Sequence, residues 1–229
     1  MEAFIDVIPF ALLGGLLGLD FVSFPQAMIS RPIVSATLAG VLMGEPVHGL
    51  TIGVALEFVA IETLPFGASR YPEWGSAGVV GGALFSGWPD TTAGTLAVSV
   101  FAALATAMLS GWSLQPHRRL IARRAASRKS ALLAGSLGAV TGLQLYGLTL
   151  DFLRAALLSG ASLLLFRPIV SVLLSDWPVA APLSRAGVVA IVAAVGASAV
   201  WKVIHGTKGA AWYLAGGFLL GGGTLWFTR

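Results

Sequence analysis

The chain has 229 residues, of which 56% are hydrophobic and 10% charged, and its mean hydropathy is +0.86. Soluble domains carry about 25% charged residues, so this composition argues against a water-soluble fold. The formal net charge is +4 and cysteine is absent, which excludes disulfides and thiolate metal sites.

Apolar stretches recur along the whole chain, and a membrane helix needs about 20 such residues. They predict an all-α polytopic membrane protein with roughly seven to nine membrane segments. The runs do not alternate apolar and polar residues, as the strands of a membrane β-barrel do. No basic stretch precedes the first apolar run, so we expect no cleavable signal peptide.

The N-terminal membrane half is predicted to cover residues 1–115. Its membrane segments are expected near 7–29, 33–44, 48–66, 75–88 and 92–114. The second and fourth are too short to cross a bilayer as straight helices. Short segments interrupted by Gly or Pro predict re-entrant or broken helices, whose backbone lines a cavity or is buried in protein.

A basic segment follows at residues 116–130, with the sequence PHRRLIARRAASRKS. It holds six of the fourteen Lys and Arg residues, and no acid occurs between Asp90 and Asp151. Such concentrations of cations mark cytoplasmic loops, so the segment predicts a basic cytoplasmic loop between two membrane halves. The charge therefore indicates topology rather than a nucleic-acid partner. A docking surface for an acidic cytosolic protein is the alternative function.

The C-terminal membrane half is predicted over residues 131–229. Its segments are expected near 130–149, 151–175, 186–203 and 210–227. The sequence RPIVS occurs at 31–35 and again at 167–171, each time after a Gly-Leu stretch that ends in Asp-Phe. The pattern indicates either two related halves, as in many transporters, or chance similarity within a biased composition.

Two carboxylates, Glu57 and Glu62, interrupt the apolar run GLTIGVALEFVAIETLPFG, residues 49–67. A carboxylate inside a membrane is costly and is tolerated where it faces a polar cavity or a partner. Five helical positions separate the two side chains by about 140° around the axis, so they do not form a facing pair. Glu57 is expected to hold a polar solute or to pair with Arg31 or Arg154, whereas Glu62 is expected near the helix end.

Four further side chains are candidates for lining the site. Asp20 and Asp151 end related apolar runs, and each is expected either to line a cavity or to cap a helix. Arg31 precedes a proline, which predicts a helix start, and its charge can instead neutralise a carboxylate. Trp74 lies in an irregular connection rich in Pro and Gly, where an aromatic ring is typical of a sugar pocket or of a membrane interface.

No motif for bond-making chemistry is found. The chain has no Walker-type phosphate loop, Gly-x-Ser-x-Gly or His-Glu-x-x-His motif, and its three histidines lack metal-ligand spacing. We therefore expect no catalytic residue, no metal and no cofactor. The protein itself is therefore not expected to be an enzyme.

One block of motifs resembles a known family. In order, the chain carries Arg31-Pro32, Gly44-Glu45, the stretch from Gly49 to Gly53, Leu56-Glu57, Gly67-Ala68 and Pro72-Glu73, with a weaker match at AAWYLAGGFLLG near the C-terminus. This order is similar to that of membrane subunit IIC of the mannose/fructose/sorbose family of the bacterial sugar phosphotransferase system (PTS).

The resemblance implies a multi-pass protein of the bacterial cytoplasmic (inner) membrane that carries a hexose inward. It implies an oligomeric complex with a IID membrane subunit and a cytosolic IIAB component that phosphorylates the sugar. The residue at the position of Glu57 is expected to contact sugar hydroxyls. Two other functions stay open from the residues alone: a stand-alone proton-coupled secondary transporter, and a non-transporting membrane scaffold.

Overall fold

The computed structural model describes residues 6–63, 71–88, 93–175 and 179–227. Within these ranges the chain forms helices and turns and no strand, which confirms the predicted all-helical class. The helices are α2 (Ile8–Val22), α3 (Pro32–Leu42), α4 (Pro46–Glu62), α5 (Trp74–Ser86), α6 (Ala93–Ser127), α7 (Lys129–Leu133), α8 (Leu137–Ser175), α9 (Ala181–Ile204) and α10 (Ala210–Phe227).

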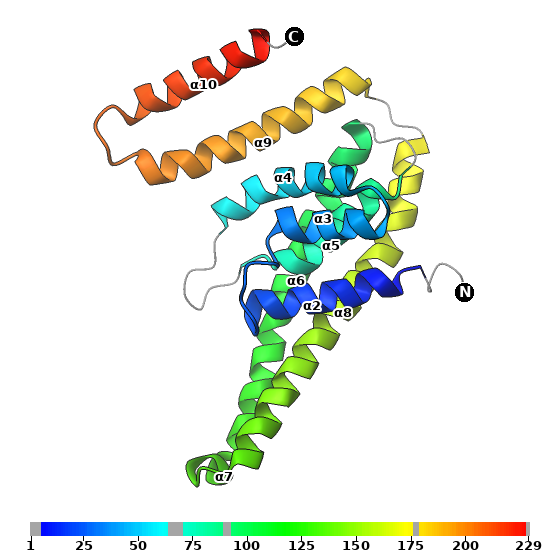
Figure 1. Cartoon of the computed structure of the whole chain (residues 1–229), viewed down its shortest axis with the longest axis vertical. Helices are drawn as coiled ribbons and strands as arrows, with labels where there is room; N and C mark the ends of the chain where they lie inside the picture. Colours follow the sequence, from blue (N-terminus) through cyan, green and yellow to red (C-terminus); the bar gives the residue numbers. More distant parts are fainter. Residues whose placement is uncertain (1–5, 64–70, 89–92, 176–178, 228–229) are drawn as a thin grey trace.

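The two longest helices, α6 and α8, pack side by side and are joined through the short α7, which caps the far end of a long hairpin (Figure 1). The remaining helices gather around the other end of this hairpin. Helix α2 packs along α8, and the α3–α4 hairpin covers α5, which in turn packs against α6. Helix α9 lies against α4 and α6, and α10 folds back along α9.

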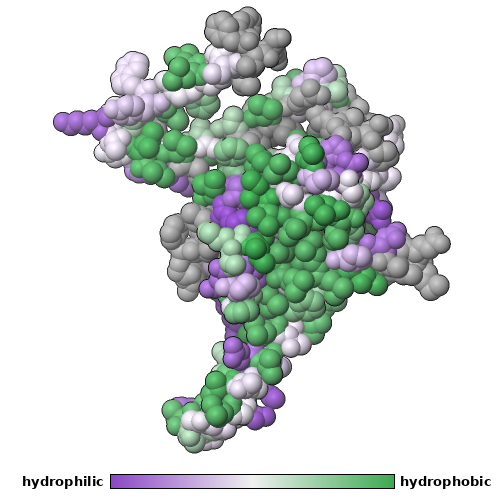
Figure 2. Space-filling model, viewed as in Figure 1, coloured by the Kyte–Doolittle hydropathy of each residue, from purple (hydrophilic) through white to green (hydrophobic). Residues whose placement is uncertain are grey.

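Helix α5 forms the centre of this arrangement, and all 13 of its residues are buried. Small residues dominate its sequence, WGSAGVVGGALFS, so that several helices can approach it closely. The outside of the molecule is apolar instead: Leu16, Phe101 and Val172 are among the exposed hydrophobic side chains. Figure 2 shows a broad hydrophobic area over the middle of the molecule.

Two helices are long and apolar enough to cross a membrane, over residues Gly94–Ser127 and Leu137–Ser175 of the described chain. Others are much shorter than a bilayer. At 1.5 Å per residue, the 11 residues of α3 extend over about 17 Å, roughly half of the hydrocarbon thickness. The expectation that this segment is too short to cross as a straight helix agrees with its length.

The basic segment is helical where a loop was expected. Helix α6 continues from the apolar stretch through residues 116–127, because this part is rich in Ala and Arg, which favour helix, and has no Gly. The predicted segments 130–149 and 151–175 likewise form one helix, α8, of 39 residues. Helix α8 runs through Asp151, the expected boundary, whose carboxylate accepts hydrogen bonds from Ser23 at the end of α2 and from Arg154 within α8.

The two RPIVS copies have different local structures. Arg31 is the N-cap of α3 with Pro32 in its first turn, as the sequence predicted for this copy. Pro168 of the second copy lies inside α8. The repeated letters therefore do not mark equivalent elements of two halves.

Candidate functional site

Arg31 and Glu57 form an ion pair between the start of α3 and the second half of α4. Nε of Arg31 lies 2.7 Å from Oε1 of Glu57, and Nη2 contacts the same oxygen. The backbone N–H of Ile33 donates to Oε2 at 3.2 Å. The side chains remain 23% and 17% exposed. Of the two partners considered for Glu57, the structure therefore selects Arg31.

The α3–α4 hairpin sets this pair in place. Gly44 in the connecting turn has φ +79°, in the left-handed region that glycine adopts without steric cost. Farther along, the two backbones nearly touch, since a Cβ on Gly49 would lie 2.9 Å from Cα of Gly40. This close antiparallel approach continues to the open end of the hairpin, where Glu57 meets Arg31.

Asp20 holds the segment that leads into Arg31. It is buried in the last turns of α2, with only 2% of its surface exposed. Its carboxylate accepts hydrogen bonds from the backbone N–H groups of Ala27, at 2.6 Å, and Ser30, at 2.9 Å. Asp20 thus fixes the connection between α2 and α3. It restrains the backbone next to Arg31 through its hydrogen bond with Ser30.

Trp74 ties the start of α5 to the end of α4. The ring is buried in the core, and its Nε1–H donates to Oγ1 of Thr63 at 3.2 Å. It lies neither in an exposed membrane belt nor in an open pocket in this conformation. Helix α4 ends at Glu62, whose side chain lies outside the described part of the chain.

A second group of charges is buried between α5, α6 and α8. Oγ of Ser110 donates to Oε2 of Glu73 at 2.6 Å and also accepts from Nη1 of Arg154 at 3.1 Å. Nε of Arg154 donates to Oδ1 of Asp151 at 2.9 Å. Glu73 and Asp151 are fully buried, so the serine and the arginine satisfy carboxylates that water does not reach.

This buried polar network also joins α2 to α8. The hydroxyl of Ser23 donates to Oδ2 of Asp151 at 2.6 Å, and Nε2 of His117 lies 3.8 Å from Oδ1. Helix capping by Asp151, one of its two expected roles, is therefore wrong: the residue lies inside α8 and bonds to other elements. Nothing in the sequence placed Ser110 or His117 beside it.

Two local signals could have indicated part of the network. Asp151 and Arg154 are one helical turn apart in an apolar run, which is the spacing of an intrahelical ion pair. Glu73 is followed three residues later by Ser76, and its Oε1 accepts from the Ser76 backbone N–H at 3.0 Å as the N-cap of α5. The contacts between helices have no such local signature.

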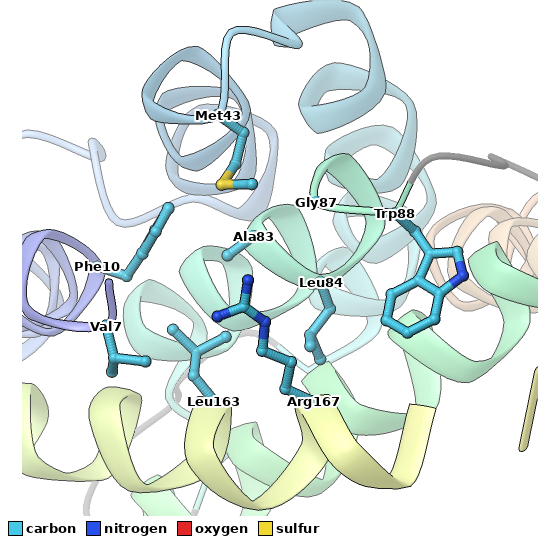
Figure 3. Close-up of a pocket in the computed structure, with 9 residues that line it drawn as sticks. All are labelled: Val7, Phe10, Met43, Ala83, Leu84, Gly87, Trp88, Leu163 and Arg167. Carbon is cyan, nitrogen blue, oxygen red and sulfur yellow. The ribbon is translucent and has the colours of Figure 1, made fainter. Parts of the chain in front are cut away.

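A separate pocket lies where α2, α5 and α8 meet near the end of α3 (Figure 3). Its walls are mostly apolar, including Phe10, Met43, Leu84 and Leu163, and the guanidinium of Arg167 points into it. None of the predicted substrate-binding residues lines it. Its walls offer no carboxylate, so this pocket lacks a charged acceptor of the kind that Glu57 provides.

Comparison with solved structures defines the class of protein. The fold is similar to that of a chain described as "Structure of membrane protein", with a TM-score of 0.66 and 22% identity over 100% of this chain and 88% of that one. It is also similar to a chain in the cryo-EM structure of the mannose transporter ManYZ in complex with microcin E492, with a TM-score of 0.57 and 20% identity over 96% and 86% of the two chains. The class that these likenesses show is an all-helical fold shared with these membrane proteins.

The sequence identifies the family. Residues 4–223 match the PTS system sorbose-specific IIC component family, and the chain belongs to it. This match confirms the resemblance drawn from the motifs between Arg31 and Glu73 and extends it over nearly the whole chain. No curated protein matches the chain.

Proposed function

We propose that the chain is the sugar-translocating IIC subunit of a phosphotransferase system, and that it carries a hexose inward across the bacterial cytoplasmic membrane. The observation that carries the proposal is the family match over residues 4–223 together with the Arg31–Glu57 pair, which joins two helices of the α3–α4 hairpin. The chain itself makes no covalent bond. A cytosolic IIAB component phosphorylates the sugar and so makes uptake irreversible.

The Arg31–Glu57 pair supplies the hydrogen-bonding groups that a hexose needs. A sugar hydroxyl both donates and accepts, so it binds best where an acceptor and a donor lie side by side. Glu57 has about four acceptor positions, of which Arg31 and Ile33 occupy three. The guanidinium has five N–H donors and uses Nε and Nη2 on the carboxylate. The remaining acceptor position of Glu57 and the remaining N–H donors of Arg31 are assigned to adjacent hydroxyl groups of the sugar.

The other candidates act around this pair. Asp20 positions Arg31 through the N–H of Ser30, and Trp74 positions the end of α4 through Thr63. Neither side chain is free to touch a sugar in this conformation, so their contribution to binding is indirect. Glu62, the last residue of α4, is kept as a further candidate for sugar binding.

The short helices support a re-entrant arrangement. Helices α3 and α4 form a hairpin with a sharp turn at Gly44, and α3 is about half a bilayer long. A hairpin of this kind that enters and leaves on one side places its turn deepest in the membrane and the Arg31–Glu57 pair at its open end, while its backbone stays covered by α5. Movement of this hairpin relative to the buried network exposes the sugar alternately to the two sides.

The partners proposed for the chain are a IID membrane subunit and the IIAB component, in an oligomeric complex. Helix α10 supports a membrane partner, because it packs along α9 and leaves Trp212, Leu219 and Leu220 exposed over more than three quarters of their surface. An apolar face of this kind is covered by lipid or by another subunit.

Direct binding of hexoses to the purified protein, with and without its IID partner, tests the proposal. We expect saturable binding of one hexose and a loss of about tenfold or more in Glu57→Gln, because hydrogen bonds to a charged acceptor contribute about 1.5–3 kcal/mol. The matched control is Glu45→Gln at the other end of the hairpin, where the carboxylate is 53% exposed. Absence of saturable binding, or equal effects of the two variants, would overturn the proposal in favour of a proton-coupled transporter or a scaffold.

A further inference from the structure

The far end of the α6–α8 hairpin carries a pocket that the transport proposal does not use. It is lined by Arg124 in the last turn of α6, by Arg128 in the turn between α6 and α7, and by Gly138, Ala139, Gly142 and Leu143 of α8. We propose that this pocket binds the phosphate group of an anionic phospholipid, with the two guanidinium groups on the phosphate and the α8 wall on the glycerol and upper acyl chain.

The two arginines make a cationic edge with no counter-charge. Arg124 lies in the last turn of α6 and Arg128 directly after its end, and both line the same pocket. No acid occurs in the sequence between Asp90 and Asp151, and no ion pair joins Arg124 or Arg128 to an acid within the described chain. Guanidinium groups bind phosphate oxygens through paired, charge-assisted hydrogen bonds.

One arginine is already oriented by the protein. The guanidinium carbon of Arg124 lies 5.5 Å from the centre of the Tyr146 ring on α8, a cation–π contact. Such a contact restrains the side chain without using its hydrogen-bond donors. The donors therefore stay available for an anion beside the pocket.

The opposite wall is suited to the apolar part of a lipid. Added Cβ atoms at Gly138 and Gly142 would meet nothing within 4 Å, so the α8 side of the pocket is open. Nearby, Leu133, Leu137 and Leu145 are exposed, by 78%, 82% and 59%. A free phosphate ion would not cover this apolar surface, and an acidic peptide would leave the leucines exposed to water.

The position along the chain agrees with a lipid headgroup. Both helices of the hairpin are long and apolar enough to cross a membrane, and the arginines follow the apolar part of α6 at its C-terminal end. Clusters of four to eight Lys and Arg beside a membrane helix recruit anionic lipids by about 1 kcal/mol for each cation. Figure 2 shows hydrophobic and hydrophilic residues side by side at this end of the molecule.

The test is a titration of the purified full-length protein with phosphatidylglycerol, followed by native mass spectrometry. We compare Arg124→Gln/Arg128→Gln with the control Arg119→Gln/Arg123→Gln. The control removes the same charge from exposed positions one turn apart on α6 that do not line the pocket. We expect the pocket pair to weaken phosphatidylglycerol binding about tenfold more than the control pair. Equal losses of phosphatidylglycerol affinity in the two pairs would overturn the proposed site and indicate only nonspecific electrostatic attraction.

Two further measurements distinguish a lipid phosphate from a free phosphate ion and control for misfolding of the variants. Inorganic phosphate at millimolar concentration should not displace phosphatidylglycerol; displacement would show that the pocket takes a free anion and would overturn the lipid assignment. Arg124→Lys/Arg128→Lys keeps the charge and should retain intermediate affinity, which a misfolded variant would not. Retained lipid binding with loss of IIAB capture in the Gln pair would assign the surface to that protein instead.

Discussion

Ser110 and Glu73 join the middle of α6 to the start of α5 through a hydrogen bond of 2.6 Å in which the serine hydroxyl donates to the carboxylate. Both residues are fully buried. Because Arg154 also donates to the same serine oxygen, the hydroxyl links a carboxylate on α5 to a cation on α8. One small side chain therefore connects three helices beneath the α3–α4 hairpin.

Ser110→Ala should lower the stability of the protein by about 1–3 kcal/mol, because it leaves a buried carboxylate oxygen and a guanidinium N–H without their partner. Thermal and denaturant unfolding in detergent measures the effect. The control is Ser127→Ala at the exposed end of α6, where the hydroxyl donates to its own helix, and we expect a change within about 0.5 kcal/mol. Similar values for the two variants would mean that the bond contributes nothing.

Asp151→Asn should be more harmful than Ser110→Ala. The substitution removes the counter-charge of Arg154, and breaking a buried ion pair from one side costs about 3–5 kcal/mol. The same unfolding measurement ranks the two variants. A milder effect of Asp151→Asn would show that Ser110 and Ser113, which also accept from Arg154, suffice to hold the arginine.

The sequence was informative where the signal is local. The apolar composition predicted a helical membrane protein, and the Arg31-Pro32 pair predicted the start of α3. The buried acid at Glu57 was expected to need either a solute or a cation, and the structure supplies Arg31. These features depend on neighbouring residues or on a single charge in an apolar run.

The sequence misled where tertiary contacts override local preference. Asp151 resembled a helix boundary, but α8 runs through it because Ser23 and Arg154 satisfy its carboxylate. Trp74 was expected in a sugar pocket or at a membrane interface, but packing against α4 and α6 buries it. Partners that lie up to 128 positions apart along the chain, as Ser23 and Asp151 do, have no pattern that a single sequence reveals.

A double-mutant cycle should find coupling between Arg31 and Glu57. The variants are Arg31→Gln, Glu57→Gln and both together, and we expect a coupling energy of about 1 kcal/mol in unfolding, since the pair is only partly buried. Each single variant leaves one charge without its partner, so the double variant should be more stable than the sum of the single effects predicts. Additive effects would contradict the pairing.

Gly49→Ala should destabilise the α3–α4 hairpin. The new methyl group would overlap with the backbone of α3 near Gly40, and overpacking of this kind costs about 1–3 kcal/mol. Gly217→Ala in α10 is the control: a Cβ there meets nothing within 4 Å, and alanine favours helix by about 1 kcal/mol. The unfolding temperature should fall for the first variant and not for the second; equal shifts would mean that the helices are farther apart.

Asp20→Ala should affect both stability and sugar binding, although its carboxylate is proposed not to touch the sugar. The change removes the acceptor of the Ala27 and Ser30 N–H groups, at a cost of about 1–3 kcal/mol, and releases the segment that holds Arg31. We expect weaker hexose binding, because the segment before α3 is no longer held in place. The control is Asp6→Ala, an exposed acid at the N-terminal end. Lower stability with unchanged hexose affinity would confine Asp20 to a structural role and separate the site from this connection.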